Sequence, residues 1–186
     1  MDIKKTVEAE ESFLISLRRH FHENPELSQQ EWKTMDFIEE TLHGWGISTV
    51  RVPRGGIFGM IDSGKDGWTV LMRADIDALP IEENPKNLAQ EKVCLSKNHG
   101  VSHACGHDGH MAMLLTAAKI LAAHKDEWEG KVLLMFEEAE EMGERGVGHL
   151  LSYLGEKKIH VDACYGTHMM YCLPAGKVAV LSLIHI

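Results

Sequence analysis

The chain has 186 residues, of which 44% are hydrophobic and 25% charged, as is ordinary for a globular domain with its own core. Its formal net charge of -9 disfavours binding to nucleic acid or to an anionic membrane, because both need clustered lysine and arginine. No apolar run approaches the roughly 20 residues of a membrane-spanning helix. The first residues lack the apolar stretch of a secretory signal, so we expect a cytoplasmic protein with reduced cysteines.

The amino-terminal part of the chain predicts two helices. Phe13, Leu17 and Phe21 lie on one apolar stripe and predict a helix over about residues 7–22, which ends before Asn24-Pro25. Ser28 and Glu31 then have the spacing of a capping box, in which a hydroxyl and a carboxylate satisfy the first amides of a helix. We therefore expect a second helix to begin there and to end near residues 44–46.

The rest of the chain alternates between strands and helices. Apolar runs predict strands at 56–61, 68–72 and 131–136, a weaker strand at 161–167 and a further one at 177–181. Helical periodicity marks residues 108–124, a shorter helix is expected at 146–154, and residues 84–100 have the composition of a loop. This alternation predicts an α/β domain with a mixed, mostly parallel sheet flanked by helices.

Side chains with metal or proton chemistry follow three of the predicted strands. The strand at 68–72 runs into Asp75 and Asp77, the strand at 131–136 runs into four glutamates, and the strand at 161–167 runs into His168. A further group, Cys105 and His107, precedes the helix at 108–124. Because ligands of open α/β sheets bind beyond the carboxyl ends of the strands, we expect all four groups to meet in one crevice.

Cys105 and His107 are the strongest candidates for metal ligands. They are two residues apart, so in an extended segment their side chains point the same way. A thiolate and an imidazole together suit zinc or another divalent transition metal. Asp108 and His110 have the right types to support a metal ligand or contact a substrate. A reactive thiol, or a loop without function, remains the alternative for this pair.

The glutamates and aspartates admit two interpretations. An acidic run such as 137–141 is usually a solvated helix start, and Asp75 and Asp77 have the types of turn or cap residues. Neighbouring side chains, however, point in different directions, so one glutamate can bind a metal while the next holds a water. Metal binding lowers the pKa of that water, and a carboxylate beside it can remove its proton. His168 on its own is a weak candidate ligand.

These segments also resemble the M20 metallopeptidases, in the branch of hippurate hydrolases, aminoacylases and auxin-conjugate amidohydrolases. The longest matching motifs are RADIDALPI at 73–81 and HACGHDGH at 103–110. Residues 18–22 and 25–27 look like the family's opening, residues 130–141 like its acidic motif, and DACYGTH at 162–168 like its later histidine motif. The resemblance runs from about residue 17 to residue 180 in the family's order.

The resemblance implies a zinc-peptidase-like catalytic domain with two divalent metal ions, which would be zinc, manganese, cobalt or nickel. It implies cleavage of the amide bond of a small N-acyl amino acid or dipeptide-like substrate by a metal-activated water. Glu140 matches the general base, and Asp75 matches a carboxylate that supports the metal centre. The residues that match metal ligands are Cys105, His107, Glu141 and His168.

The chain departs from the family pattern in two respects. The family usually has Gln-Pro-Ala-Glu-Glu where this chain has EEAEE at 137–141. The family's catalytic domain is also completed after an inserted lid and dimerisation domain, and the later part supplies one more histidine ligand. We therefore expect residues 1–180 to be the amino-terminal part of the catalytic domain. The lid would be absent, and the intact protein would dimerise through it.

Residues 181–186, LSLIHI, match a reading frame of a transposon end used in sequencing libraries, and we expect a foreign or truncated tail there. A natural strand is the alternative, and His185 is given no role.

Three functions follow from these observations. The leading hypothesis is a metal-dependent amidohydrolase. The second is a catalytically inactive fragment that still binds metal, since the expected last ligand and lid lie beyond this chain. The third is an amidase with Cys105 as nucleophile and His107 or His110 as base, although two residues along one strand face is poor geometry for such a pair.

Overall fold

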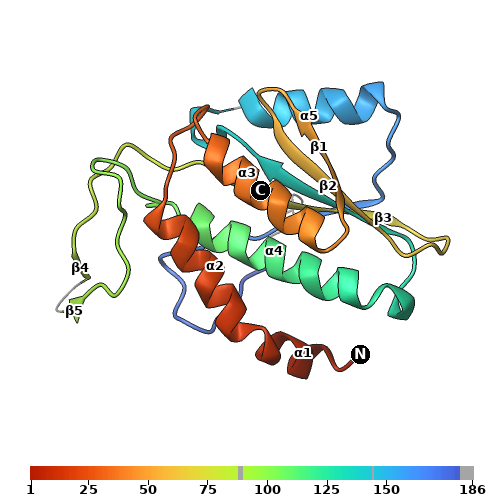
Figure 1. Ribbon diagram of the computed structural model, residues 1–186, viewed down its shortest axis with the longest axis horizontal. Helices are drawn as coiled ribbons and strands as arrows, with labels where there is room; N and C mark the ends of the chain where they lie inside the picture. Colours follow the sequence, from red (N-terminus) through yellow and green to blue (C-terminus); the bar gives the residue numbers. More distant parts are fainter. Residues whose placement is uncertain (88–89, 144, 181–186) are drawn as a thin grey trace.

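The computed structural model describes residues 1–87, 90–143 and 145–180, so the predicted tail at 181–186 lies outside the described residues. Figure 1 shows a central sheet with helices packed against it. The five-stranded sheet has the order β1 (Ser48–Val52), β2 (Gly56–Asp62), β6 (Lys131–Glu137), β3 (Thr69–Asp75) and β7 (Ala163–Gly166). Strands β1, β3, β6 and β7 run in one direction and β2 runs in the other, which confirms a mixed, mostly parallel sheet.

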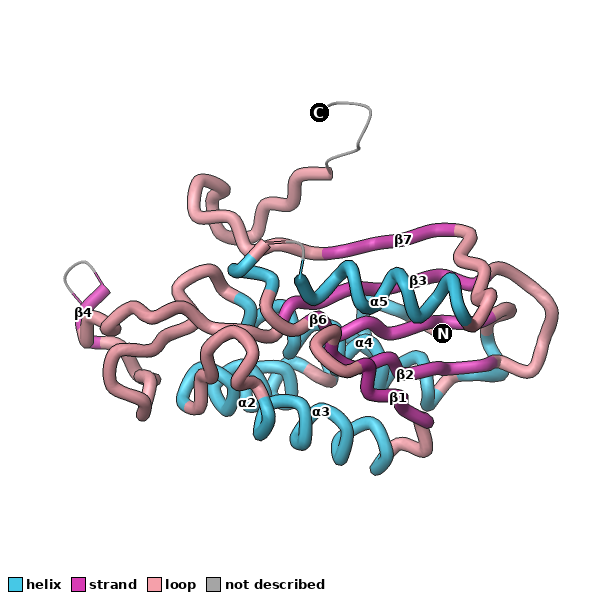
Figure 2. Tube along the Cα trace, turned by 90° about the horizontal axis from the view of Figure 1, so that it is seen from above, coloured by secondary structure: helices cyan, strands magenta, loops and turns pink. Residues whose placement is uncertain are grey.

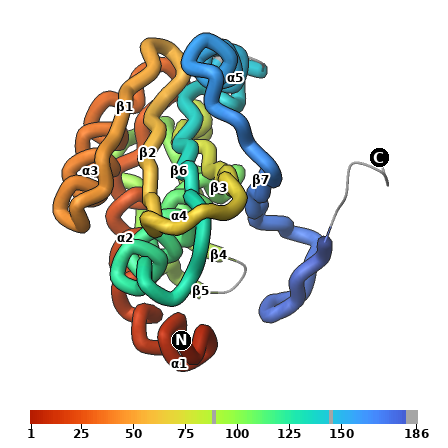
Figure 3. Tube along the Cα trace, turned by 90° about the vertical axis from the view of Figure 1, so that its right-hand side faces the viewer, coloured from red at the N-terminus to blue at the C-terminus, as the bar shows by residue number. Residues whose placement is uncertain are grey.

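Helices cover both faces of this sheet (Figure 3). On one face lie α2 (Glu11–Glu23), α3 (Trp32–Gly44) and α4 (His107–Ala123), with the short α1 (Ile3–Ala9) leading into α2. On the other face lies α5 (Arg145–Glu156). The remaining elements are small: the hairpin β4 (Lys86–Asn87) and β5 (Gln90–Glu91), and the short 3-10 helices η1 (Lys125–Glu127) and η2 (Glu140–Met142).

Strand β6 shows why the apolar runs became central strands. Leu134 and Phe136 belong to the core under α2, α3 and α4, whereas Leu133 and Met135 pack on the α5 side with Leu150. A strand buried on both faces needs apolar residues at every position rather than at alternate ones. This burial fixes β6 in the middle of the sheet and places its carboxyl end beside that of β3, where Asp75 pairs with Glu137.

Three expectations about the helices and strands were wrong. The first helix is two helices, because the chain leaves helical geometry at Glu10. The predicted strand at 177–181 is absent from its described part, residues 177–180, which are exposed and form no strand. The capping box is not formed: α3 begins at Trp32 without a side-chain cap from Glu31, and the hydroxyl of Ser28 instead donates to Asp77.

Among the residues that the structure describes, none of the helices combines the length and the apolar character that crossing a bilayer requires.

Candidate metal centre

The side chains singled out in the sequence meet beyond the carboxyl ends of the parallel strands. Asp75 is the last residue of β3, and His168 follows the end of β7 by two residues. The amino-terminal end of α4 carries His107 to the same place, and η2, which follows β6, carries Glu140 and Glu141. In Figure 2 these strand ends and the start of the post-β7 segment lie at one end of the sheet.

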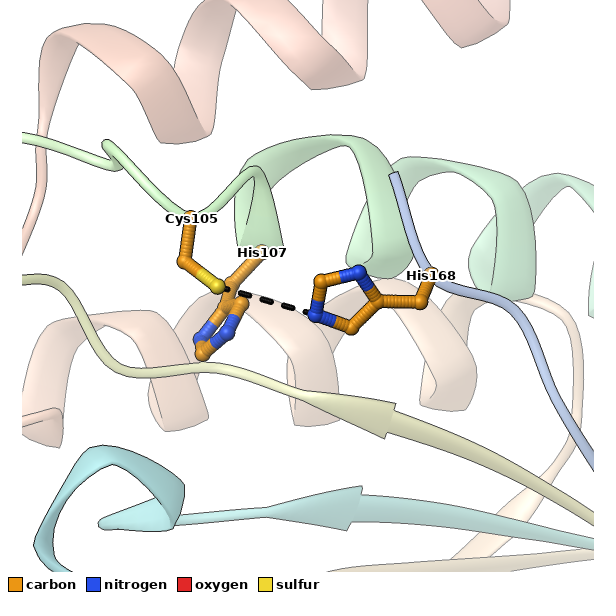
Figure 4. Close-up of side chains that lie close together, drawn as sticks. All are labelled: Cys105, His107 and His168. Atoms are coloured by element: carbon orange, nitrogen blue, oxygen red, sulfur yellow. Dashed lines mark hydrogen bonds between the residues drawn. The ribbon is translucent and has the colours of Figure 1, made fainter. Parts of the chain in front are cut away.

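A thiol and two imidazoles converge there (Figure 4). The Sγ atom of Cys105 lies 3.6 Å from Nε2 of His168, and one ligand atom from each of Cys105, His107 and His168 lies within 4.8 Å of the other two. Gly106 makes this possible, because its φ of 99° turns the chain from Cys105 into α4. A Cβ atom at this position would come 2.8 Å from Cβ of Met169, so glycine also provides space.

The two glutamates of η2 approach the same imidazole. Nε2 of His107 lies 3.7 Å from a carboxylate oxygen of Glu140 and 3.7 Å from Oε1 of Glu141. Ligands of a tetrahedral zinc ion with bonds of about 2.0–2.3 Å lie about 3.3–3.8 Å apart, so these separations suit a bound cation. Both Nε2 of His107 and Oε1 of Glu141 are buried without a hydrogen-bond partner among the described residues, which is the arrangement that a metal ion would satisfy.

Asp77 fixes the orientation of His107. Its Oδ1 atom lies 3.2 Å from Nδ1 of His107, while its Oδ2 accepts hydrogen bonds from Ser28 Oγ at 2.7 Å and from the backbone N–H of Glu141 at 3.0 Å. A carboxylate that holds the far nitrogen of a histidine is the usual support of a metal-binding imidazole. The family resemblance implies a supporting role for Asp75, and Asp77 has the same kind of role at His107.

Asp75 lies at the centre and also connects it to other residues, since its Oδ2 atom is 3.6 Å from Nε2 of His107. Its two oxygens bind Nδ1 of His110 at 2.6 Å and Nη1 of Arg73 at 2.7 Å. His110 in turn accepts a hydrogen bond at Nε2 from the backbone N–H of Met169, the residue after His168. Burial works against the charge of Asp75, but His110, His107 and Arg73 outweigh it and lower its pKa to about 2. Asp75 therefore stays ionised and anchors the segment that carries His168.

Asp108, which has the right type to support a ligand or contact a substrate, binds two residues of α2. It accepts a hydrogen bond from Nδ1 of His22 at 2.6 Å and lies 3.2 Å from Nε of Arg18. Both partners belong to α2, so this buried contact ties the start of α4, where the chain delivers His107, to the neighbouring helix.

The electrostatics of the centre favour a cation. Burial and the nearby Glu141 raise the pKa of the Cys105 thiol to about 12, and burial and the charge of Asp75 raise the pKa of Glu140. Although burial opposes it, Asp77 and Asp75 raise the pKa of His107. All three shifts arise from carboxylates crowded into a buried space. A divalent cation would compensate this charge and deprotonate the thiol, so the donor set fits a metal.

Comparison with known proteins bears on the same residues. Residues 71–181 match the family model described as Peptidase family M20/M25/M40, and this span includes all six predicted site residues. The chain is 39% identical over 182 residues to the N-acyl-L-amino acid amidohydrolase of Geobacillus stearothermophilus, covering 97% of this chain and 47% of that protein. It is 40% identical over 169 residues to the IAA-amino acid hydrolase ILR1-like 2 of Arabidopsis thaliana, covering 90% and 36%.

The chain is also similar to a solved structure of an M20 family protein. The YXEP protein of Bacillus subtilis, described as a dinuclear metal binding peptidase from the M20 family, superposes with a TM-score of 0.79 at 36% identity, covering 90% of this chain and 45% of that one. The chain thus spans 36% to 47% of the length of these three proteins. The family match extends over more than half of the chain, from β3 through the segment that carries His168. On this evidence the chain belongs to peptidase family M20/M25/M40.

Proposed function

We propose that this protein is a metal-dependent amidohydrolase. One observation carries the proposal: the ligand atoms of Cys105, His107 and His168 lie within 4.8 Å of one another, and two glutamate carboxylates face the same imidazole at 3.7 Å. Because the chain spans about half of its relatives' length, the proposal concerns the whole protein. Residues 1–180 supply the amino-terminal part of its catalytic domain in this proposal.

The proposed ligands are those that the sequence suggested. Cys105, His107, Glu141 and His168 hold divalent cations, two of them if the centre follows the dinuclear description of the YXEP protein. Zinc, manganese, cobalt and nickel all suit such a mixture of sulfur, nitrogen and oxygen donors. When bound, a divalent cation supplies a water of lowered pKa and polarises the carbonyl group of the substrate.

The protein's own groups perform the proton transfers in this proposal. Glu140 accepts a proton from the attacking water and delivers it to the nitrogen of the leaving amine. Its pKa is raised by burial and by Asp75, which moves a carboxylate toward the range in which it both accepts and returns a proton. Asp77 keeps Nε2 of His107 directed at the centre, and Asp75 holds His110 against the backbone beside His168.

The proposed substrate is a small N-acyl amino acid or dipeptide-like molecule. The names of the relatives support this class, since one is an N-acyl-L-amino acid amidohydrolase and the other an IAA-amino acid hydrolase. The net charge of -9 supports a small-molecule substrate rather than nucleic acid. We also propose that the intact protein dimerises through a lid domain.

The geometry disfavours a cysteine nucleophile. Cys105 Sγ lies 3.6 Å from Nε2 of His168, and both nitrogens of His110 already have hydrogen-bond partners. A thiol whose pKa is raised to about 12 is also almost wholly protonated at neutral pH. Cys105 therefore suits a cation better than it suits covalent catalysis.

Metal content and activity measured together test the proposal. The chain, and a longer version that includes its natural continuation, are stripped with a chelator and reloaded with zinc, manganese, cobalt or nickel. We expect bound metal in both, and hydrolysis of N-acyl amino acids that chelator abolishes and Glu140→Gln prevents without loss of metal. Activity in the longer version alone would show that the chain by itself is an inactive metal-binding fragment, and metal binding without activity in both versions would contradict the proposal. Activity that resists chelation would contradict the proposal.

A further inference from the structure

Two backbone N–H groups of the turn that carries the glutamates are held by carboxylates from other parts of the chain. Oε1 of Glu31 accepts a hydrogen bond from the N–H of Ala139 at 2.8 Å. Oδ2 of Asp77 accepts one from the N–H of Glu141 at 3.0 Å. Glu140 lies between these two fixed points, so the position of its backbone is set from both sides.

Both fixed points depend on side chains from the short segment before α3. Glu31 belongs to this segment, and the hydroxyl of Ser28 donates to Oδ2 of Asp77 at 2.7 Å, the same oxygen that holds Glu141. The segment is itself anchored at the exit of β3, because Leu27 forms a parallel bridge with Ala78, and the N–H of Ala78 donates to the carbonyl of Glu26 at 2.8 Å. Ser28 and Glu31 therefore reach both ends of the turn from a fixed base.

The turn needs such support. Ala139 adopts a left-handed conformation with φ of 57°, which a residue with a side chain takes up at a cost of about 1–2 kcal/mol. It is 1% exposed, so an unpartnered N–H at this position would also be buried. The helix that follows, η2, has three residues and is too short to fix its own start.

We propose that residues 28–31 are a positioning brace for the turn at 139–141, with Glu31 and Ser28 as positioning residues that set where the carboxylates of Glu140 and Glu141 lie. The inference rests on the proposed function for the part that those two carboxylates play. Neither residue touches substrate or metal in this proposal. Both act through the backbone of the turn, Glu31 directly and Ser28 through Asp77.

The capping of α3 does not depend on Glu31, because a different side chain of the segment before the helix provides it. The carboxylate of Glu26 caps α3, accepting from the N–H of Thr34 at 2.8 Å and from its hydroxyl at 2.9 Å. Glu31 has no such role at the helix it precedes. Glu26 therefore offers a matched control: a carboxylate of the same segment whose loss disturbs α3 but not the turn.

Amide hydrogen exchange of the metal-free chain tests the brace directly. Glu31→Ala removes the acceptor, so we expect the Ala139 amide to exchange at least roughly tenfold faster. Glu31→Gln keeps an acceptor oxygen and should retain the native rate. Ser28→Ala should speed exchange at Glu141 by a smaller factor. Glu26→Ala should speed exchange at Thr34 and leave the turn unchanged.

Cobalt absorption then shows whether the brace sets the metal centre. We expect Glu31→Ala to shift the visible bands of the cobalt-loaded chain and to weaken cobalt binding several-fold. Glu31→Gln should restore both the bands and the affinity. Glu26→Ala should change neither. Native exchange at Ala139 in Glu31→Ala would overturn the proposal, as would a cobalt spectrum equally disturbed by Glu26→Ala. If Glu31→Ala does not fold, Ser28→Ala decides by the same two readouts. If the unaltered chain binds no cobalt, the proposed function fails, while the exchange rates still decide the brace.

Discussion

Nδ1 of His107 lies 3.2 Å from Oδ1 of Asp77, while Nε2 of the same ring faces the carboxylates of Glu140 and Glu141. An ionised carboxylate only accepts hydrogen bonds, so Nδ1 must carry the hydrogen when the ring is neutral. Nε2 then presents its lone pair to the centre. The aspartate thus decides which nitrogen of His107 is available to a cation.

Replacing Asp77 by asparagine should therefore weaken metal binding while leaving every proposed ligand in place. Loss of a carboxylate behind a metal-binding histidine typically costs about 10–100-fold in affinity. We expect a loss of that size for Asp77→Asn when zinc is titrated against a competing chelator. Asp36→Asn is the control, because Asp36 is an exposed carboxylate that pairs with Arg51. Unchanged affinity in Asp77→Asn would show that Asp77 does not orient the ligand.

A second relationship joins His110 to His168. His110 holds the N–H of Met169, and Asp75 holds His110, so the position of His168 depends on a ring that is not itself a ligand. We expect His110→Ala and His168→Ala each to reduce zinc affinity. The loss in the double variant should be smaller than the sum of the two, because His110 acts through His168. Additive losses in this double-mutant cycle would contradict the coupling.

Gly106 should be intolerant of any side chain. With φ of 99°, and with Cβ of Met169 only 2.8 Å from where a methyl group would lie, Gly106→Ala combines backbone strain with a clash. We expect the free energy of unfolding to fall by about 1–3 kcal/mol in urea titrations. Gly148→Ala is the matched control, because Gly148 lies in α5 with nothing within 4 Å of its added methyl group. That variant should be unchanged or more stable by up to about 1 kcal/mol.

Much of the fold could be predicted from burial patterns in the sequence. Strand β6 and helix α4 can be predicted because the strand has a continuous apolar run and the helix has an apolar face, and both enter the core. Strand β1 was missed for the opposite reason. Val52 is its one fully buried residue, and its other positions are polar or partly exposed, so its signal was too weak to separate from a loop.

The residues of the site could be predicted from the sequence, but the hydrogen bonds that hold them in place could not. The strand-end rule places Asp75, Glu141 and His168 near one another, because parallel strands end at the same edge, and His107 joins them from the start of α4. The local spacing of Ser28 and Glu31 satisfies the pattern of a capping box and predicts one. Their actual partners, Asp77 and Ala139, are 49 and 108 residues away in the chain. A hydrogen bond across such a distance depends on tertiary packing, which local spacing does not encode.

Cys105 should supply the thiolate that a bound cation requires. Cobalt bound to a thiolate shows an intense near-ultraviolet charge-transfer band, and we expect Cys105→Ser to abolish it and to weaken zinc binding, because a hydroxyl is a poorer ligand for zinc than a thiolate. Cys164→Ser is the control, since Cys164 is an exposed cysteine of β7 outside the ligand cluster. If the band persists in Cys105→Ser, a different cysteine binds the cobalt.

Glu31 should make the stability of the metal-free chain depend on pH. Burial raises its pKa from 4.5 to about 7, with the charges of Asp77 and Glu138 acting in the same direction and the hydrogen bond from Ala139 opposing it. Between about pH 4.5 and pH 7 the folded state holds a proton on Glu31 that the unfolded state has lost, so the contribution of Glu31 to the free energy of unfolding falls as the pH rises. The full shift corresponds to at most about 3 kcal/mol.

Urea titrations with chelator at pH 5 and pH 8 measure this fall, and Glu31→Gln removes the titrating group while keeping the acceptor for Ala139. We expect the variant to lose less stability than the unaltered chain between the two pH values, the difference being the contribution of Glu31. An equal loss in both proteins would mean that Glu31 is ionised at pH 5 in the folded chain. The buried Oε2 atom, which has no hydrogen-bond partner among the described residues, would then carry a charge without compensation, which such burial strongly disfavours.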